Sequence, residues 1–490
     1  MIKRKKFSYI TIGFTLFLLL ALVIPVSATV WPVTTANAGT SILFQPWING
    51  TSSNDTIDLA PGTYFLNNLT VFQNLTIESN QTLGGTAQNT IIDGQYIPTN
   101  NGIIGNNSVN AVFFEGSTIT IKDLTLQNGN STSSAGGGAV SVHGNIVVYS
   151  SNFLNDASMG HYGGALSMQG GNGNITVSGS NFINCSANQG GAIYDNNGNV
   201  FVTSSSFVNI QATTLAGAIY GTNGVNATFC RFSNITCPGD HTFIETNGGD
   251  IYAPNNWWGT NNPDHLTIFK FNGGGTYTLN PWLVLGITAQ QSTITTIQTN
   301  TITANLLYYN DSTPQSGNIP TDGMPVTFTV VPAASGSVST SSGTFANMLS
   351  QTTFTPRVVG SVSVNATVDN AIVSVSFDIT PAPNNKPSYG QPNTNPNTGY
   401  IGPQPAPIGV SSGGPGPKPQ LAPLQTVSTP IASVTALPPV QNPSIIAMVI
   451  LTLQEYQFWL ILAVIVIILV AILRRWWIKR QNPSLFRKQN

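Results

Sequence analysis

Charged residues are scarce in this sequence. Lysine, arginine, aspartate and glutamate make up 7% of its 490 residues, whereas glycine alone accounts for 48. So few charges are unusual for a cytosolic enzyme, and they suit a β-rich surface outside the cell. A length of 490 residues predicts two or three domains.

Basic residues are nearly absent from the middle of the chain. Ten of the 16 lie at the two ends, and residues 29–456 hold only six against all 17 acidic residues, a net charge of −11. An acidic middle repels nucleic acid, and no basic groove can be assembled to bind it. The sequence therefore excludes nucleic acid as a partner.

Cysteine is also rare, and its three positions give no disulfide framework. Cys185 and Cys237 fall two repeats apart, too far to bridge, and Cys230 falls on an inward position. The four histidines are scattered, so no Cys/His spacing indicates a metal site. We predict buried free thiols, no metal and no cofactor.

The middle of the chain repeats with a period in the mid-twenties, and its copies show no apolar pattern of helical period. Residues 119–258 contain about five copies of short alternating strands separated by Gly or Asn clusters. An aromatic column recurs at spacings of 29, 25, 25 and 26 and consists of Phe153, Phe182, Phe207, Phe232 and Trp258. The pattern predicts a parallel β-helix whose column stacks in the core at about 4.8 Å per coil.

Two further columns accompany the aromatic one. The first holds asparagine, two residues after each aromatic position: Asn128, Asn155, Asn184, Asn209 and Asn234. The second holds Gly-Ala pairs that begin at Gly138, Gly164, Gly191 and Gly217. We interpret the asparagines as a structural amide ladder at an inner corner of each coil.

These copies resemble the right-handed parallel β-helix repeats of the pectin-lyase-like superfamily. The core GGAIY, residues 190–194, is similar to repeats of chlamydial polymorphic outer-membrane proteins. The closing NNWWGTNNP, residues 255–263, is similar to the last coil of adhesin-like surface proteins of methanogenic archaea. The resemblance covers roughly residues 42–380, and it implies a surface adhesin in which a β-helix precedes an immunoglobulin-like domain and a membrane anchor.

The fold class predicted is all-β, with residues 29–286 as the β-helix and residues 30–56 as its N-terminal cap. Residues 287–380 lose the repeat and gain longer alternating strands, which predicts an immunoglobulin-like β-sandwich without a disulfide. Residues 381–443 hold 16 of the 31 prolines, a composition that predicts a disordered, extended linker.

Both ends carry membrane-related signals. Residues 1–28 read as a signal peptide with Lys3–Lys6 before an apolar run, cleaved after Ala28 or after Ala38, or kept as an anchor helix. Residues 444–475 read as a membrane anchor with its span at about 456–473, and residues 476–490 as a basic cytoplasmic tail. The predicted location is the cell membrane, single-pass, with the ectodomain outside.

Thirteen Asn-x-Ser/Thr sequons lie in the predicted ectodomain, which suggests a glycoprotein if the cell has the machinery. Asn184 and Asn234 belong to the predicted inward ladder, so we expect them to be poor glycan acceptors. The sequons are Asn49, Asn54, Asn68, Asn74, Asn80, Asn106, Asn130, Asn174, Asn184, Asn226, Asn234, Asn310 and Asn365.

An enzyme must be weighed, because the resembled superfamily includes pectate lyases and polygalacturonases. Their NTD, GHG, RIK and WIDH signatures are missing, and the only adjacent pair of opposite charge is Lys122-Asp123. Asp93, Asp123, Asp156, Asp195 and Asp250 occupy different columns of the repeat, which predicts that no two carboxylates stack on neighbouring coils. The only basic residues between 42 and 286 are Lys122, Arg231 and Lys270.

The sequence therefore predicts no catalytic, cofactor-binding or metal-binding residues. It favours a membrane-anchored, adhesin-like surface protein whose β-helix binds carbohydrate or another cell surface. Two alternatives stay open: a polysaccharide lyase or hydrolase, and a purely structural envelope protein.

Overall fold

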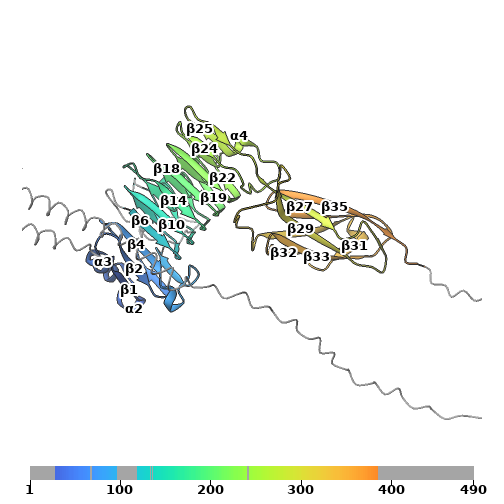
Figure 1. Ribbon diagram of the computed structural model, residues 1–490, viewed down its shortest axis with the longest axis horizontal. Helices are drawn as coiled ribbons and strands as arrows, with labels where there is room; N and C mark the ends of the chain where they lie inside the picture. Colours follow the sequence, from blue (N-terminus) through green and yellow to red (C-terminus); the bar gives the residue numbers. More distant parts are fainter. Residues whose placement is uncertain are drawn as a thin grey trace, which may run out of the picture. The chain divides into compact units, whose positions relative to one another are not determined.

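The computed structural model describes residues 28–66, 69–95, 118–132, 134, 136–239 and 242–383. The predicted signal peptide up to residue 27, the Pro-rich linker from residue 384, the membrane anchor and the basic tail lie outside these ranges. Within the described ranges, no helix is both long and apolar enough to cross a membrane. The described residues form a parallel β-helix and a β-sandwich, which belong to one compact unit (Figure 1).

Sheet A of the β-helix consists of ten parallel strands, one from each successive coil. In spatial order they are β1 (Val30–Val33), β2 (Asp55–Leu59), β4 (Leu75–Ser79), β6 (Thr118–Lys122), β10 (Asn145–Tyr149), β14 (Ile175–Ser178), β18 (Asn199–Thr203), β21 (Gly224–Thr228), β24 (Asp250–Tyr252) and β26 (Tyr277–Thr278).

Sheets B and C complete the coils. Sheet B contains β3 (Gly62–Phe65), β5 (Thr90–Asp93), β7 (Thr125–Gln127), β11 (Asn152–Leu154), β15 (Asn181–Ile183), β19 (Ser206–Leu215), β16 (Ser186–Gln189), β12 (Ala157–Tyr162) and β8 (Asn130–Ser131), with β22 (Arg231–Thr236) paired to β19. Sheet C contains β25 (Phe269–Phe271), β23 (Ile244–Thr246), β20 (Ile219–Gly221), β17 (Ile193–Asp195), β13 (Leu166–Met168) and β9 (Val140–Val142).

The predicted aromatic column is confirmed as a continuous stack inside the β-helix. Phe153, Phe182, Phe207 and Phe232 are fully buried, and Trp258 ends the stack at 3% exposure. Successive ring centroids lie 4.8, 4.9, 5.0 and 4.6 Å apart with nearly parallel planes. The spacing equals that of neighbouring strands, so one aromatic side chain per coil fills the core without a gap.

The glycine column lets adjacent coils approach each other closely. A Cβ atom on Gly138, Gly164 or Gly191 would collide with the backbone carbonyl of the equivalent glycine in the next coil. Only glycine fits where two backbones come so near. The Gly-Ala pairs are therefore structural.

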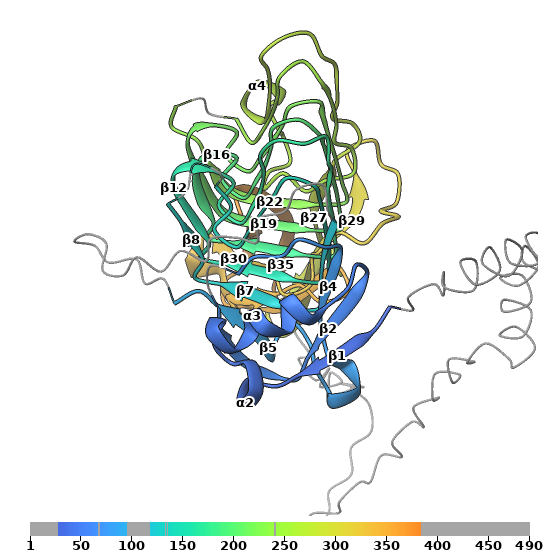
Figure 2. The same cartoon turned by 90° about the vertical axis from the view of Figure 1, so that its left-hand side faces the viewer.

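The N-terminal region differs from the all-β expectation in one respect. Besides β1 it forms two helices, α2 (Thr35–Ala38) and α3 (Ser41–Gly50), at the near end of the β-helix in Figure 2. Phe44 and Ile48 of α3 are buried in the β-helix core. Ile42 and Leu43 of the same helix are exposed. The apolar pattern of helical period is thus limited to Phe44 and Ile48, which is too short to predict a helix from the sequence.

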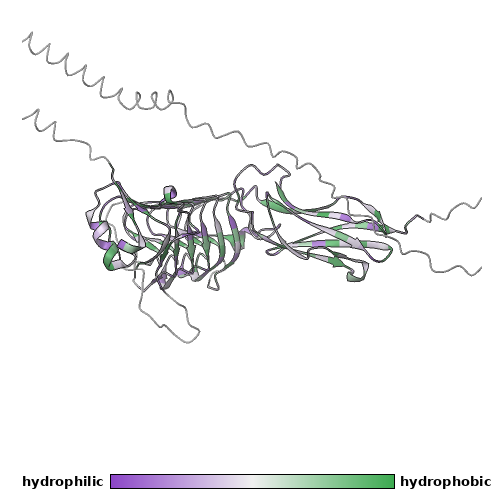
Figure 3. Ribbon diagram, turned by 90° about the horizontal axis from the view of Figure 1, so that it is seen from below, coloured by the Kyte–Doolittle hydropathy of each residue, from purple (hydrophilic) through white to green (hydrophobic). Residues whose placement is uncertain are grey.

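The second domain is the predicted β-sandwich. One sheet contains β27 (Leu283–Ala289), β29 (Asn300–Tyr309), β33 (Leu349–Pro356) and β31 (Gly336–Val338); the other contains β28 (Thr293–Thr295), β35 (Ala371–Thr380), β34 (Gly360–Val368), β30 (Pro325–Val331) and β32 (Ser342–Thr344). Its first strand begins at residue 283, four residues before the expected boundary. Alternating hydrophobic positions on these strands, visible in Figure 3, form the sandwich core.

The junction between the two domains depends on Asp369, at the turn between β34 and β35. Its carboxylate accepts hydrogen bonds from Arg231 Nη2 at 2.9 Å, Ser233 Oγ at 2.6 Å and Trp257 Nε1 at 2.7 Å. The Arg231 and Asp369 side chains are only 12% and 8% exposed. Trp257, from the last coils of the β-helix, packs into the sandwich core.

Candidate functional site

A row of four outward side chains crosses the first coils of sheet A. Asp58, Glu78, Lys122 and Tyr149 are successive register partners on β2, β4, β6 and β10. Each follows a buried Ile or Val, so the alternation of the strand turns it to the outer face. The row therefore places two carboxylates, one ammonium group and one phenol on adjacent strands.

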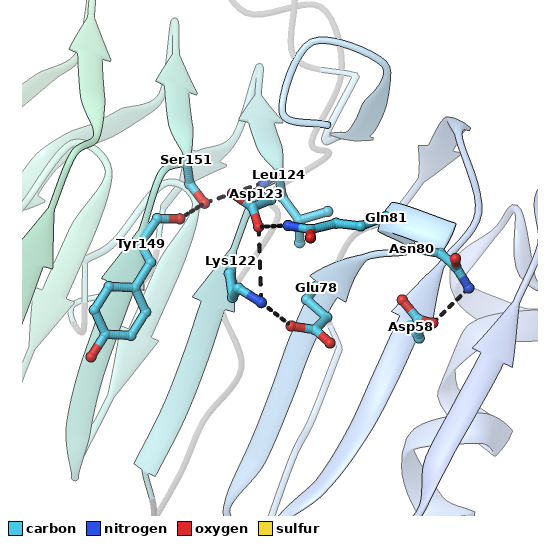
Figure 4. Close-up of polar contacts among 9 residues, drawn as sticks. All are labelled: Asp58, Glu78, Asn80, Gln81, Lys122, Asp123, Leu124, Tyr149 and Ser151. Carbon is cyan, nitrogen blue, oxygen red and sulfur yellow. Dashed lines mark hydrogen bonds and ion pairs between the residues drawn. The ribbon is translucent and has the colours of Figure 1, made fainter. Parts of the chain in front are cut away.

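Every charge in this row has a partner (Figure 4). Lys122 Nζ lies 2.8 Å from Glu78 Oε2 and 4.0 Å from Asp123 Oδ2. Asn80 Nδ2 donates to Asp58 Oδ2 at 2.6 Å, and Gln81 Nε2 donates to Asp123 Oδ2 at 2.7 Å. The turn that holds Asn80 and Gln81, including the short helix η1 (Gln81–Leu83), thus lies against the row.

Burial and neighbouring charges shift the pKa values of Asp58 and Lys122 in this row. Partial burial raises the pKa of Asp58, and the negative charge of Glu78 raises it further, against the opposing effect of Lys122. The hydrogen bond to Glu78 raises the pKa of Lys122. Asp58 therefore holds its proton more tightly than a free carboxyl group, which is a property that a general acid requires.

This geometry corrects the sequence-based expectation about carboxylates. Asp58 and Glu78 do lie on neighbouring coils, so the prediction that stacked carboxylates are absent is wrong. The five aspartates weighed from the sequence are indeed dispersed, with Asp156 and Asp195 fully buried. The sequence does hold a signal for this pair. The segments TID, TIE and TIK, residues 56–58, 76–78 and 120–122, each place a charged residue directly after an inward isoleucine.

An open polar groove adjoins the row at the corner between sheets A and B. Its lining comes from the 81–88 turn and from three successive coils, and includes Gln81, Asp123, Ser150, Asn152, Gly179 and Asn181. Asn181 Nδ2 donates to Asn152 Oδ1 at 2.9 Å, and Asn152 Nδ2 donates to Thr125 Oγ1 at 3.1 Å. Amide and carboxylate groups at this spacing suit a ligand rich in hydroxyl groups.

The asparagine column forms the predicted amide ladder, but it faces solvent. Each Nδ2 donates to the Oδ1 of the preceding coil at 2.9–3.3 Å, from Asn234 back to Asn128. The backbone φ at these positions is 51–57°, the left-handed region that asparagine tolerates. That turn directs the side chains outward, so Asn155, Asn184, Asn209 and Asn234 are exposed. The prediction that the ladder lies at an inner corner is therefore wrong. The reason for expecting Asn184 and Asn234 to be poor glycan acceptors is wrong as well, because both side chains are exposed.

The three basic residues of the β-helix all have acidic neighbours. Lys122 contacts Glu78, Arg231 contacts Asp369, and Lys270 Nζ lies 3.8 Å from Glu245 Oε1. Arg231 is thus part of the domain junction and is removed from any surface site.

The cysteine prediction is confirmed, and no metal centre appears among the described residues. Cys185, Cys230 and Cys237 form no disulfide with one another, and all three are buried. In the part of the chain that the structure describes, no group of three His, Cys, Asp or Glu side chains could hold a metal ion.

Comparison with known proteins gives no family assignment. No family model matches the chain, and no curated protein matches it. Among solved structures it is similar to the D00-D0 domain of Intimin, with 19% identity over 21% of this chain and 53% of that one, at a TM-score of 0.15. It is also similar to domains 4 and 5 of the S-layer protein SbsC, with 17% identity over 21% of this chain and 55% of that one, at a TM-score of 0.16. The chain spans about half the length of each of these structures.

Proposed function

We propose that this chain is a cell-surface protein whose β-helix binds a polymeric ligand, a carbohydrate or another cell surface, without changing it chemically. The observation that carries the proposal is the set of equivalent polar positions repeated on the outside of successive coils. The ladder from Asn128 to Asn234 presents five such positions, one coil apart, and the last four are exposed. A polymer can make several weak contacts in series along them and gain avidity without a deep pocket.

The surface location is supported by the sequence outside the described residues. Six basic residues follow the apolar run that ends at Leu473, and none lies between Lys418 and Arg474. By the positive-inside rule this places the C-terminus in the cytoplasm and the β-helix outside. Protease added to intact cells should then remove the ectodomain and leave the basic tail protected. A tail that external protease can digest would reverse this topology.

Binding without turnover is tested on a panel of polysaccharides. The purified full chain is applied to immobilised uncharged polysaccharides (glucan, xylan and mannan) and to polygalacturonate, and the soluble products are assayed for reducing and unsaturated ends. We expect retention on at least one polymer with no release of ends. A chain retained by none of them would favour the purely structural envelope protein and overturn the proposal.

A second candidate function rests on the pair Asp58 and Glu78 beside Lys122. Two carboxylates on adjacent strands, one of them with a raised pKa, favour a polysaccharide lyase or hydrolase. Release of sugar ends that both Glu78→Gln and Lys122→Ala abolish would establish this activity. Arg231→Ala does not test it, because Arg231 contacts Asp369 at the junction.

A further inference from the structure

Three exposed aromatic side chains occur on alternate coils of sheet A. Tyr149 lies on β10, Phe201 on β18 and Tyr252 on β24, and β14 and β21 separate them. Their exposed fractions are 43%, 41% and 48%. A single exposed aromatic residue is common on protein surfaces, but a periodic row on one face needs an explanation.

The register fixes how these side chains line up. Phe201 pairs with Asn226, which pairs with Tyr252, so Phe201 and Tyr252 share one outward column two coils apart. At about 4.8 Å per coil their separation is about 10 Å. Tyr149 is on the same face but two residues further along its strand, a displacement of about 7 Å. We call Tyr149, Phe201 and Tyr252 the aromatic strip.

The surface around the strip is polar and carries one charge, that of Asp250 on β24, whose carboxylate accepts hydrogen bonds from Thr276. The outward residues on the intervening strands are Thr176 and Ser178 on β14, then Asn226 and Thr228 on β21. The charged row of Asp58, Glu78 and Lys122 ends one coil before the strip begins. On the outward positions of β10 to β24 the one charge is negative, so this face has no cation to attract an acidic polymer, and it offers hydroxyl and amide groups between apolar rings.

We propose that the aromatic strip binds an uncharged polysaccharide that runs along the axis of the β-helix; this rests on the proposed binding function, names its ligand class and adds a contact face on sheet A to the asparagine ladder beside sheet B. Sugar rings have an apolar face that stacks on aromatic side chains, and their hydroxyl groups bond to Ser, Thr and Asn. The repeat of about 10 Å is close to the length of a disaccharide, so alternate sugars meet a ring. A peptide that added a strand would need an open sheet edge, whereas the strip lies on a face.

The experiment compares strip variants of the full chain for affinity to soluble glucan, xylan and mannan. Phe201→Ala and Tyr252→Ala should each weaken binding several-fold, and the double variant by about tenfold or more, because contacts in series multiply. Phe65→Ala is the matched control: Phe65 is 44% exposed but lies on sheet B. It should leave the affinity within about twofold of the wild-type value.

The outcomes separate this inference from the proposed function. If the wild-type chain binds no polysaccharide, the proposed function fails and the strip fails with it. If the wild-type chain binds but the double variant, with an unchanged melting temperature, binds equally well, only the strip fails. Binding restricted to polygalacturonate and lost at high salt would also overturn the strip, as would a native glycan on Asn226 that covers it.

Discussion

Phe182 shows how much one residue per coil contributes to this fold. Its ring stacks at 4.8 Å on Phe153 and at 4.9 Å on Phe207, and it is fully buried. Removing it would leave a cavity with aromatic neighbours on both sides, in a stack that cannot shift because each ring is tied to its own strand.

We therefore expect Phe182→Ala to lower the free energy of unfolding by about 3–5 kcal/mol. Chemical denaturation measures it, and Thr176→Ala, on the outer face of sheet A, is the control. A loss no larger than that of the control would contradict the role of the stack.

Asp195 makes stability depend on pH. Burial raises its pKa to about 6 from 3.8, against hydrogen bonds from the backbone N–H groups of Gly198 and Asn197. The folded state therefore binds more protons than the unfolded state between these values. The stabilisation is complete below about pH 4 and is lost as the pH rises through 6.

The melting temperature should thus rise as the pH falls from 7 to 5, and Asp195→Asn should flatten this dependence. Thermal scans across that range provide the measurement. Asp311→Asn serves as the control, because hydrogen bonds from Thr313 lower the pKa of Asp311 and place its titration below the window. If the melting temperature of Asp195→Asn depends on pH as steeply as that of the wild-type protein, another group is responsible for the pH dependence.

At the scale of the element, the corner of each coil explains both a success and a failure of sequence reasoning. The column of asparagines was predictable because its spacing follows the aromatic column. The direction of the asparagine side chains could not be predicted from the sequence. The positive φ of residues such as Asn184 turns the side chain outward, and strand alternation gives no information at such a position.

The Asp58–Glu78–Lys122 row was missed for a different reason. The first pair is 20 residues apart in the sequence and the second 44, although each pair is in register in the sheet. Loops of unequal length between early coils erase the period, so only the strand pairing brings these charges together. The aromatic stack could be predicted because its coils differ in length by only a few residues.

The asparagine corner gives a prediction that separates backbone from side chain. Asn184→Ala loses both the ladder bonds and the tolerance of φ 57°, whereas Asn184→Gly loses only the bonds. Alanine should therefore be the more destabilising substitution by about 1 kcal/mol, as denaturant midpoints would report. Equal stability of the two variants would mean that the left-handed turn does not select asparagine here.

At the scale of the whole molecule, the junction at Asp369 decides whether the two domains unfold together. A single carboxylate there accepts three hydrogen bonds from the last coils of the β-helix, and Trp257 contributes to the sandwich core. Removal of this carboxylate would lower the free energy of unfolding, because the charge of the largely buried Arg231 would lose its partner without gaining contact with water.

Asp369→Ala should therefore lower the free energy of unfolding by about 3–5 kcal/mol and split one thermal transition into two, as the sandwich uncouples from the β-helix. Calorimetry follows both effects, and limited proteolysis should find new cleavage near residues 259–283. Asp378→Ala, at an exposed position on β35 of the same domain, is the control and should change neither. A single transition with wild-type midpoint in Asp369→Ala would show that the remaining contacts of Trp257 suffice to couple the domains, and that the carboxylate does not.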